Sequence, residues 1–151
     1  MAEEVDYEKI LDNLELELHK NEKNWNKIID DLSKKINNEL KHTIELSAEA
    51  ISYRQMLLEE RTQVYYKIYK SMPKLKQLEK SKFEFYSTKY QIKINATEKA
   101  KLIDADLSYH SAKMEYLQNH INFLTECVKN VDHVIWSVKN KIEFYNISGL
   151  D

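Results

Sequence analysis

Apolar side chains recur three and four residues apart along most of this chain, which is the spacing of one face of an α-helix. The pattern is most regular between Met114 and Tyr145 and predicts a helix over residues 107–146. Its heptad repeat is sustained over more than four repeats, as in a coiled-coil seam. An ordinary core helix is the less favoured alternative. We expect eight residues of this seam to hold subunits together: Leu117, Ile121, Leu124, Val128, Val131, Ile135, Val138 and Ile142.

Other large side chains of this predicted helix lie outside the heptad positions. A helix that is apolar beyond one stripe packs against more than one neighbour. We therefore expect it to meet helices of its own chain and helices of other subunits. These further side chains are Tyr116, Phe123, Cys127, Val134, Trp136 and Phe144.

The remaining apolar pattern predicts at least two more helical regions. Residues 5–40 read as one or two amphipathic helices, and we treat residues 1–35 as an N-terminal helical extension of a main helical domain over 36–151. A longer helix is predicted from about Glu39 to Met72, with an apolar residue at every seventh position. These residues are Ile44, Ile51, Leu58, Tyr65 and Met72.

The middle of the chain is less regular. Pro73 either begins a new helix or kinks the preceding one, and a helical pattern resumes from Lys74 to about Tyr86. Residues 87–97 are the least regular segment. Tyr90, Ile92 and Ile94 alternate with polar residues, which is strand periodicity, and we interpret the segment as a connector that pairs with a neighbouring chain. Thr97 is the predicted N-cap of the next helix, with Asp104 and Asp106 in its first turns.

Composition supports an all-α, elongated fold. The 151 residues include a single glycine, Gly149, and a single proline, so the many tight turns of a β protein are excluded. Apolar residues make up 42% of the chain and charged residues 32%, which is lean for one compact globule. We therefore expect a homo-oligomer that completes its core by assembly.

Targeting features are missing from the pattern. The N-terminus is acidic, and no apolar run approaches the roughly 18 residues that a membrane span needs. The single cysteine, Cys127, suits a reducing compartment. We expect an intracellular protein without membrane partners.

Charge is distributed unevenly, although the formal net charge is only −2. Residues 1–63 carry 15 acidic and 9 basic side chains, and residues 64–101 carry 3 acidic and 10 basic ones. Residues 102–151 are acidic again. Because a partner responds to local potential, the basic block over 64–101 is where we expect function to lie.

No catalytic or metal-binding pattern accompanies this block. The five histidines are scattered, and one glycine cannot build a phosphate-binding loop. Asp104 and Asp106 are interpreted as helix-start residues, and Cys127 as a packing residue. We expect a protein that is not an enzyme and needs no cofactor or metal.

Lysines in the basic block are interleaved with aromatic residues. Lysines neutralise phosphates and rings stack on unpaired bases, which is the combination that single-strand binders use. An ordinary solvated helix face above core aromatics explains the composition equally well. On the first interpretation, the DNA-binding residues are Lys74, Lys76, Lys80, Lys82, Lys89, Tyr86 and Tyr90.

The block also carries a family resemblance. The run Lys80-Ser81-Lys82-Phe83-Glu84-Phe85-Tyr86-Ser87 resembles the Lys-x-Arg, apolar, acidic, aromatic-aromatic-serine order of the phage recombination mediators, the UvsY-like family. Residues 53–57 are similar to the family's Tyr-x-Lys-Trp-Leu, and residues 102–106 to its apolar-Ser-Ala-Asp. About 100 residues are covered, up to Gly149, whereas residues 1–35 match poorly. Lys82 replaces the arginine, Thr88 stands where glycine is frequent, and the connector is shorter.

The resemblance implies a ring-forming protein that binds single-stranded DNA. Such mediators help a RecA-like recombinase to load onto DNA that is coated by single-strand binding protein. Lys80 and Lys82 would contact DNA, the C-terminal helix would drive assembly, and a phage protein would act in the cytoplasm of its host. The alternative is a coiled-coil scaffold or adaptor whose basic block binds an acidic protein partner.

Overall fold

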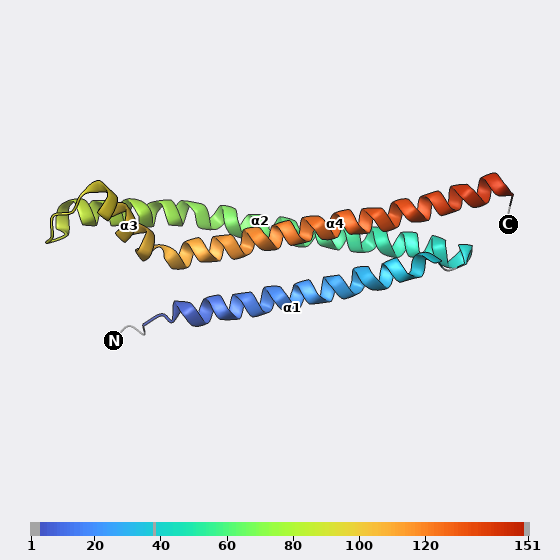
Figure 1. Cartoon of the computed structure of the whole chain (residues 1–151), viewed down its shortest axis with the longest axis horizontal. Coiled ribbons are helices and arrows are strands. Elements are labelled where there is room, and N and C mark those ends of the chain that lie inside the picture. The colour runs from blue at the N-terminus through green and yellow to red at the C-terminus, as the bar shows by residue number, and fades with distance from the viewer. Residues whose placement is uncertain (1–3, 38, 150–151) are drawn as a thin grey trace.

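The chain folds into an elongated arrangement of helices, as shown by a computed structural model that describes residues 4–37 and 39–149 (Figure 1). The α-helices are α1 (Tyr7–Lys34), α2 (Leu40–Glu84), α3 (Ala96–Asp106) and α4 (Ser108–Ser148). A 3-10 turn, η1 (Lys35–Asn37), joins α1 to α2, and a π-helical turn, η2 (Phe85–Lys89), follows α2. The prediction of an all-α, elongated fold is confirmed for the described residues. Among these residues no helix combines the length and hydropathy needed to cross a membrane.

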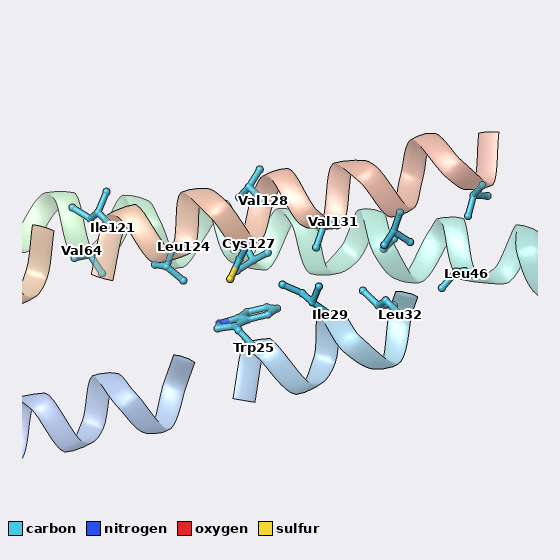
Figure 2. Close-up of a cluster of buried hydrophobic side chains, with 14 of the residues drawn as sticks. Trp25, Ile29, Leu32, Leu46, Val64, Ile121, Leu124, Cys127, Val128 and Val131 are labelled. Carbon is cyan, nitrogen blue, oxygen red and sulfur yellow. The ribbon is translucent and has the colours of Figure 1, made fainter. Parts of the chain in front are cut away.

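The central feature is the antiparallel pair of α2 and α4, with α1 lying beside it (Figure 1). The buried side chains of all three helices form one continuous apolar cluster along the pair (Figure 2). Helix α2 contributes Leu46, Ala50, Leu57 and Val64 to this cluster. An ion pair between Arg54 and Asp132, 2.6 Å from Nε to Oδ1, joins the two helices at their exposed edge.

The predicted heptad of the C-terminal helix has its partners inside the chain. Six of its residues are buried within this single chain: Leu117, Ile121, Leu124, Val128, Val131 and Val138. Ile135 and Ile142 are partly buried against the same cluster. The repeat therefore builds the core of one chain. The contact between subunits that the sequence assigned to these residues stays a prediction, and it would have to compete with this intramolecular packing.

The wide apolar surface of α4 is explained by two neighbours in the same chain. Cys127 and Val134 lie beside the heptad positions and are buried in the cluster shared with α1. The expectation that this helix packs against more than one helix of its own chain is thus confirmed. Trp136 and Phe144, by contrast, are each 64% exposed and take no part in the core.

Helix α1 joins the core through its C-terminal half. Trp25, Ile29 and Leu32 are buried among residues of α2 and α4 (Figure 2). The indole Nε1 of Trp25 donates a hydrogen bond to Glu60 of α2, 2.9 Å away, and its ring packs edge-on against Tyr53. Much of residues 1–35, predicted as an extension, is therefore part of the main helical packing.

Pro73 lies inside α2, which is continuous from Leu40 to Glu84. A proline in a helix removes the hydrogen bond to the carbonyl four residues earlier, here that of Tyr69. Both residues are exposed, so water can solvate the freed carbonyl. Of the two alternatives for Pro73, the start of a new helix is excluded, because α2 continues through it.

The segment after α2 is a connector, and the alternation at Tyr90, Ile92 and Ile94 forms no strand within the described chain. Residues 85–89 form the π-helical turn, and residues 90–95 are irregular. Asn95, rather than Thr97, is the N-cap of α3, because its side chain accepts from the Glu98 backbone N–H while Glu98 accepts from the Asn95 N–H. Asp104 and Asp106 lie at the end of α3 instead of in its first turns, so that prediction is also wrong.

Helix α4 ends at Gly149, whose φ of 64° is in the left-handed region. Glycine has no Cβ to oppose this conformation, which is why it commonly terminates helices. The single glycine of the chain therefore stands where the backbone requires it.

Candidate nucleic-acid interface

The basic and aromatic residues gather at one end of the molecule, which we call the tip and define as residues 74–106. The chain reverses there: α2 ends, the π-helical turn and the irregular residues follow, and α3 runs back beside the end of α2 (Figure 1). A turn of this kind brings side chains of α3 next to those of α2. The tip lies far along the rod from the α1–α2 junction (Figure 1).

Three rings pack together in the π-helical turn. The centroids of Tyr86 and Tyr90 are 5.0 Å apart, and Phe85 lies 5.1 Å from Tyr86 and 6.1 Å from Tyr90. The i to i+5 hydrogen bond from the Tyr90 N–H to the Phe85 carbonyl, 2.9 Å, closes the turn beneath them. Edge-to-face packing of this kind stabilises the turn in water. Phe85 is exposed, whereas Tyr86 and Tyr90 are half-buried.

Asp106 binds two of the predicted DNA-binding residues. Its Oδ2 accepts a 2.6 Å hydrogen bond from the Tyr86 hydroxyl and lies 3.5 Å from the Lys82 ammonium. Hydrogen bonding to this carboxylate raises the pKa of Tyr86 to about 12, because the bond favours the protonated phenol. The same contacts compensate the unfavourable position of a carboxylate at the C-terminus of α3. Lys82 and Tyr86 are therefore held together by an internal anion.

A second cluster surrounds Phe83 on the other side of the tip. The ring of Phe83 is exposed, and the Lys99 ammonium of α3 lies 4.7 Å from its centroid in a cation–π contact. Lys99 also donates a 3.0 Å hydrogen bond to the Ser87 hydroxyl. Since Lys76, Lys80 and Phe83 follow one another at helical spacing, they share a face of α2. Lys99 therefore adds a fourth member to this face from another helix.

Four of the predicted lysines remain available to a ligand. Within the described part of the chain, none of them forms an ion pair with an acidic side chain, and all are exposed. They are Lys74, Lys76, Lys80 and Lys89. Cationic groups next to an exposed ring can neutralise phosphates while the ring stacks on a base.

Two participants of this site were not predicted from the sequence. Lys99 lay within the basic block but had no pattern linking it to Phe83. Asp106 was interpreted as a helix-start residue, and only the reversal of the chain between α2 and α3 shows that it faces Lys82. The sequence shows that Asp106 is an acidic residue beside the basic block, but its contact with Lys82 depends on how the chain reverses between α2 and α3.

Two buried groups outside the tip, His120 and Cys127, belong to the packing of the helices. His120 is 4% exposed, and its Nδ1 lies 3.2 Å from the Glu22 carboxylate of α1. Burial, the largest cause, raises the pKa of the Cys127 thiol to about 11, so the reactive thiolate is disfavoured. The described residues contain no group of three His, Cys, Asp or Glu side chains placed to hold a metal ion.

In comparisons with known proteins, no protein-family model, curated protein or solved structure matches this chain. The resemblance to recombination mediators thus stands on the residues of the sequence alone.

Proposed function

We propose that this protein is a recombination mediator that binds single-stranded DNA through its tip. In this role it forms a homo-oligomer with a ring-like arrangement of subunits and helps a RecA-like recombinase to load onto DNA coated by single-strand binding protein. The observation that supports DNA binding most directly is the exposed ring of Phe83, which has the Lys99 ammonium 4.7 Å from its centroid and shares a helix face with the exposed Lys76 and Lys80. A solvated face would not need an exposed phenylalanine at its centre.

In the proposed mechanism the tip binds the strand in a sequence-independent manner. Lysines contact phosphates, which carry no sequence information, and Phe83 stacks on a base. Several tips of one oligomer bind the same strand, so weak contacts per subunit combine into strong binding. A DNA strand bound in this way is released from the coating protein and presented to the recombinase.

The test is the salt dependence of binding to a labelled oligonucleotide. Each phosphate contact contributes about 0.7 to the slope of log K against log salt on a single strand. Replacing Lys76 and Lys80 with alanine should therefore weaken binding for every base sequence and reduce the slope by roughly 1.4 per engaged subunit. Phe83→Ala should lower affinity by about 1–3 kcal/mol with little change in slope.

A matched control is available on α1. Lys23 and Lys27 have the same four-residue spacing as Lys76 and Lys80 and are also exposed. Their replacement should leave DNA binding unchanged. If both double variants bind as the wild type does, or if poly-glutamate displaces the oligonucleotide at equal charge concentration, the scaffold that binds an acidic protein becomes the better description.

A further inference from the structure

Helix α2 carries a second apolar stripe that faces away from the core. Its members are large and outward-facing: Ile51 is 54% exposed, Tyr69 is 68% exposed, and Ile44, Tyr65 and Met72 are exposed as well. We define the outer stripe as Ile44, Ile51, Tyr65, Tyr69 and Met72. Four of these residues occupy heptad positions, and Leu58, at the heptad position between Ile51 and Tyr65, is partly buried and packs against the core. The core-facing residues of α2 form a separate seam of Leu46, Ala50, Leu57 and Val64.

The outer stripe has the length and spacing of a helix-pairing surface. From Ile44 to Met72 it extends about 42 Å at about 1.5 Å per residue. A heptad spacing keeps the side chains on one face, where another helix can pack along them. Scattered apolar residues on a surface need no explanation, but exposed apolar residues in heptad register over this length, interrupted only at Leu58, mark an interaction site.

The charges of α2 indicate which partner fits the stripe. Several charged side chains of α2 contact other parts of the same chain, namely Glu49, Arg54, Glu60, Arg61 and Lys82. Without them, residues 40–60 keep two acidic side chains and one basic one, whereas residues 61–84 keep two acidic and five basic ones. A second α2 that runs in the opposite direction would place its basic half beside the acidic half of the first. A parallel second copy would place like charges together. The stripe and its charges are therefore self-complementary in the antiparallel orientation only.

We infer that two copies of this chain pair through the outer stripe, with their α2 helices antiparallel about a two-fold axis near residue 60. Such a contact is isologous, because the same patch serves both copies. In this arrangement Ile51 of one copy lies near Tyr69 of the other. This inference rests on the self-association in the proposed function and assigns a surface to pairs of subunits. Because a two-fold contact closes on itself, a ring would be built from such pairs through a second contact. The inference does not depend on DNA binding.

The pairing leaves the outer end of each tip accessible. With the axis near residue 60, Lys76 of one copy lies opposite Ile44 of the other and is partly covered, whereas residues 81–84 of each α2 project past the other copy. The two Lys80 residues lie about 60 Å apart at opposite ends of the pair. A dimer of this form presents two separated binding sites to one flexible strand. The core heptad of α4 is left intact, since the contact uses a face that the single chain does not cover.

The experiment is sedimentation equilibrium of the full-length chain, with Ile51→Asp compared with Trp136→Asp. Both side chains are exposed to a similar extent, so both variants should fold, and circular dichroism checks this. We expect Ile51→Asp to raise the dimer dissociation constant more than about tenfold, because an unpaired charge becomes buried at the contact. Trp136→Asp should leave it unchanged. A wild type that is monomeric, or a dimer that only Trp136→Asp disrupts, would overturn the inference.

The relative orientation of the two α2 helices has its own test. Cys127 is buried, so cysteines introduced at the surface can be oxidised selectively. A mixture of Ile51→Cys and Tyr69→Cys chains should form a disulfide between the two variants, and neither variant alone should cross-link efficiently. Cross-linking of Ile51→Cys with itself would indicate parallel helices and refute the arrangement. DNA binding at the tip is measured separately, so its failure and the failure of this pairing are distinguishable.

Discussion

At the scale of single residues, the contact of Asp106 with Lys82 and Tyr86 determines which groups can meet a phosphate. One carboxylate oxygen of Asp106 contacts both groups: it lies 3.5 Å from the Lys82 Nζ and 2.6 Å from the Tyr86 hydroxyl oxygen. An incoming phosphate would have to replace it. Lys80 and Lys82, which the sequence treats as equivalent, are therefore different: Lys80 is free to bind, and Lys82 must first exchange its partner.

Asp106→Asn should accordingly increase the affinity for single-stranded DNA severalfold and steepen its salt dependence, since Lys82 becomes available for a phosphate contact. It should also lower the pKa of Tyr86 from about 12 towards the ordinary value of 10. The stability from this bond is fully present below about pH 10 and is lost as the pH rises through 12, because the folded chain holds the proton more tightly. Titration followed by NMR of labelled tyrosine measures the pKa. A variant with the lowered pKa but unchanged DNA affinity would show that Lys82 and Tyr86 lie outside the interface.

At the scale of the helices, the sequence predicted which segments are helical better than it predicted what each face contacts. The heptad of α4 was visible from spacing alone, because helical periodicity is a local property. Spacing does not say whether the partner helix belongs to the same chain, and here α2 of the same chain fills the seam around Leu124 and Val131. The outward heptad at Ile51 and Tyr65 was also visible, yet only burial separates it from the core seam.

The connecting turns show the same limit of prediction from local sequence patterns. The capping box at Asn95 and Glu98 is a local signal that competes with Thr97, and the backbone geometry decides between them. A π-helical turn leaves no distinct pattern in the sequence, so residues 85–89 could not be predicted as one. The contact of Asp106 with Lys82 depends on the π-helical turn and on where α3 begins. The lysines and aromatic residues of the candidate site could therefore be named from the sequence, whereas their contact with Asp106 could not.

The assignment of the α4 seam to the core makes a specific prediction. Ile121→Asp places an unpaired carboxylate at a position that is 1% exposed, and should cost several kcal/mol. The expected result is a large loss of helicity and of the cooperative thermal transition. A variant that keeps its melting temperature and only dissociates into monomers would restore the subunit seam. Lys139→Asp, at an exposed position of the same helix, is the control and should change stability little.

At the scale of the whole molecule, the structure is a rod with the basic and aromatic tip at one end and a core that runs along its middle. The two halves of helix α1 contact this core differently. Its first turns contact α4 at the surface, where the rings of Tyr7 and Tyr109 lie 4.4 Å apart. Its last turns bury Trp25, Ile29 and Leu32. A boundary placed at residue 35 from family resemblance therefore cuts through the packing, whereas a boundary near residue 20 does not.

Two truncations test this division. Removing residues 1–20 takes away side chains that are exposed or half-buried, so the remaining chain should fold, lose only a few degrees of melting temperature and bind single-stranded DNA as the full chain does. Removing residues 1–35 takes away three buried apolar side chains, each of which contributes about 1.5–3 kcal/mol by burial. Their sum is comparable with the 5–15 kcal/mol by which most domains are stable, so this shorter chain should be largely unfolded or aggregated. Circular dichroism and oligonucleotide binding distinguish the two. Equal folding of both truncations would mean that α1 is an independent extension, and loss of DNA binding in a well-folded 21–151 chain would place part of the binding site in α1 instead of the tip.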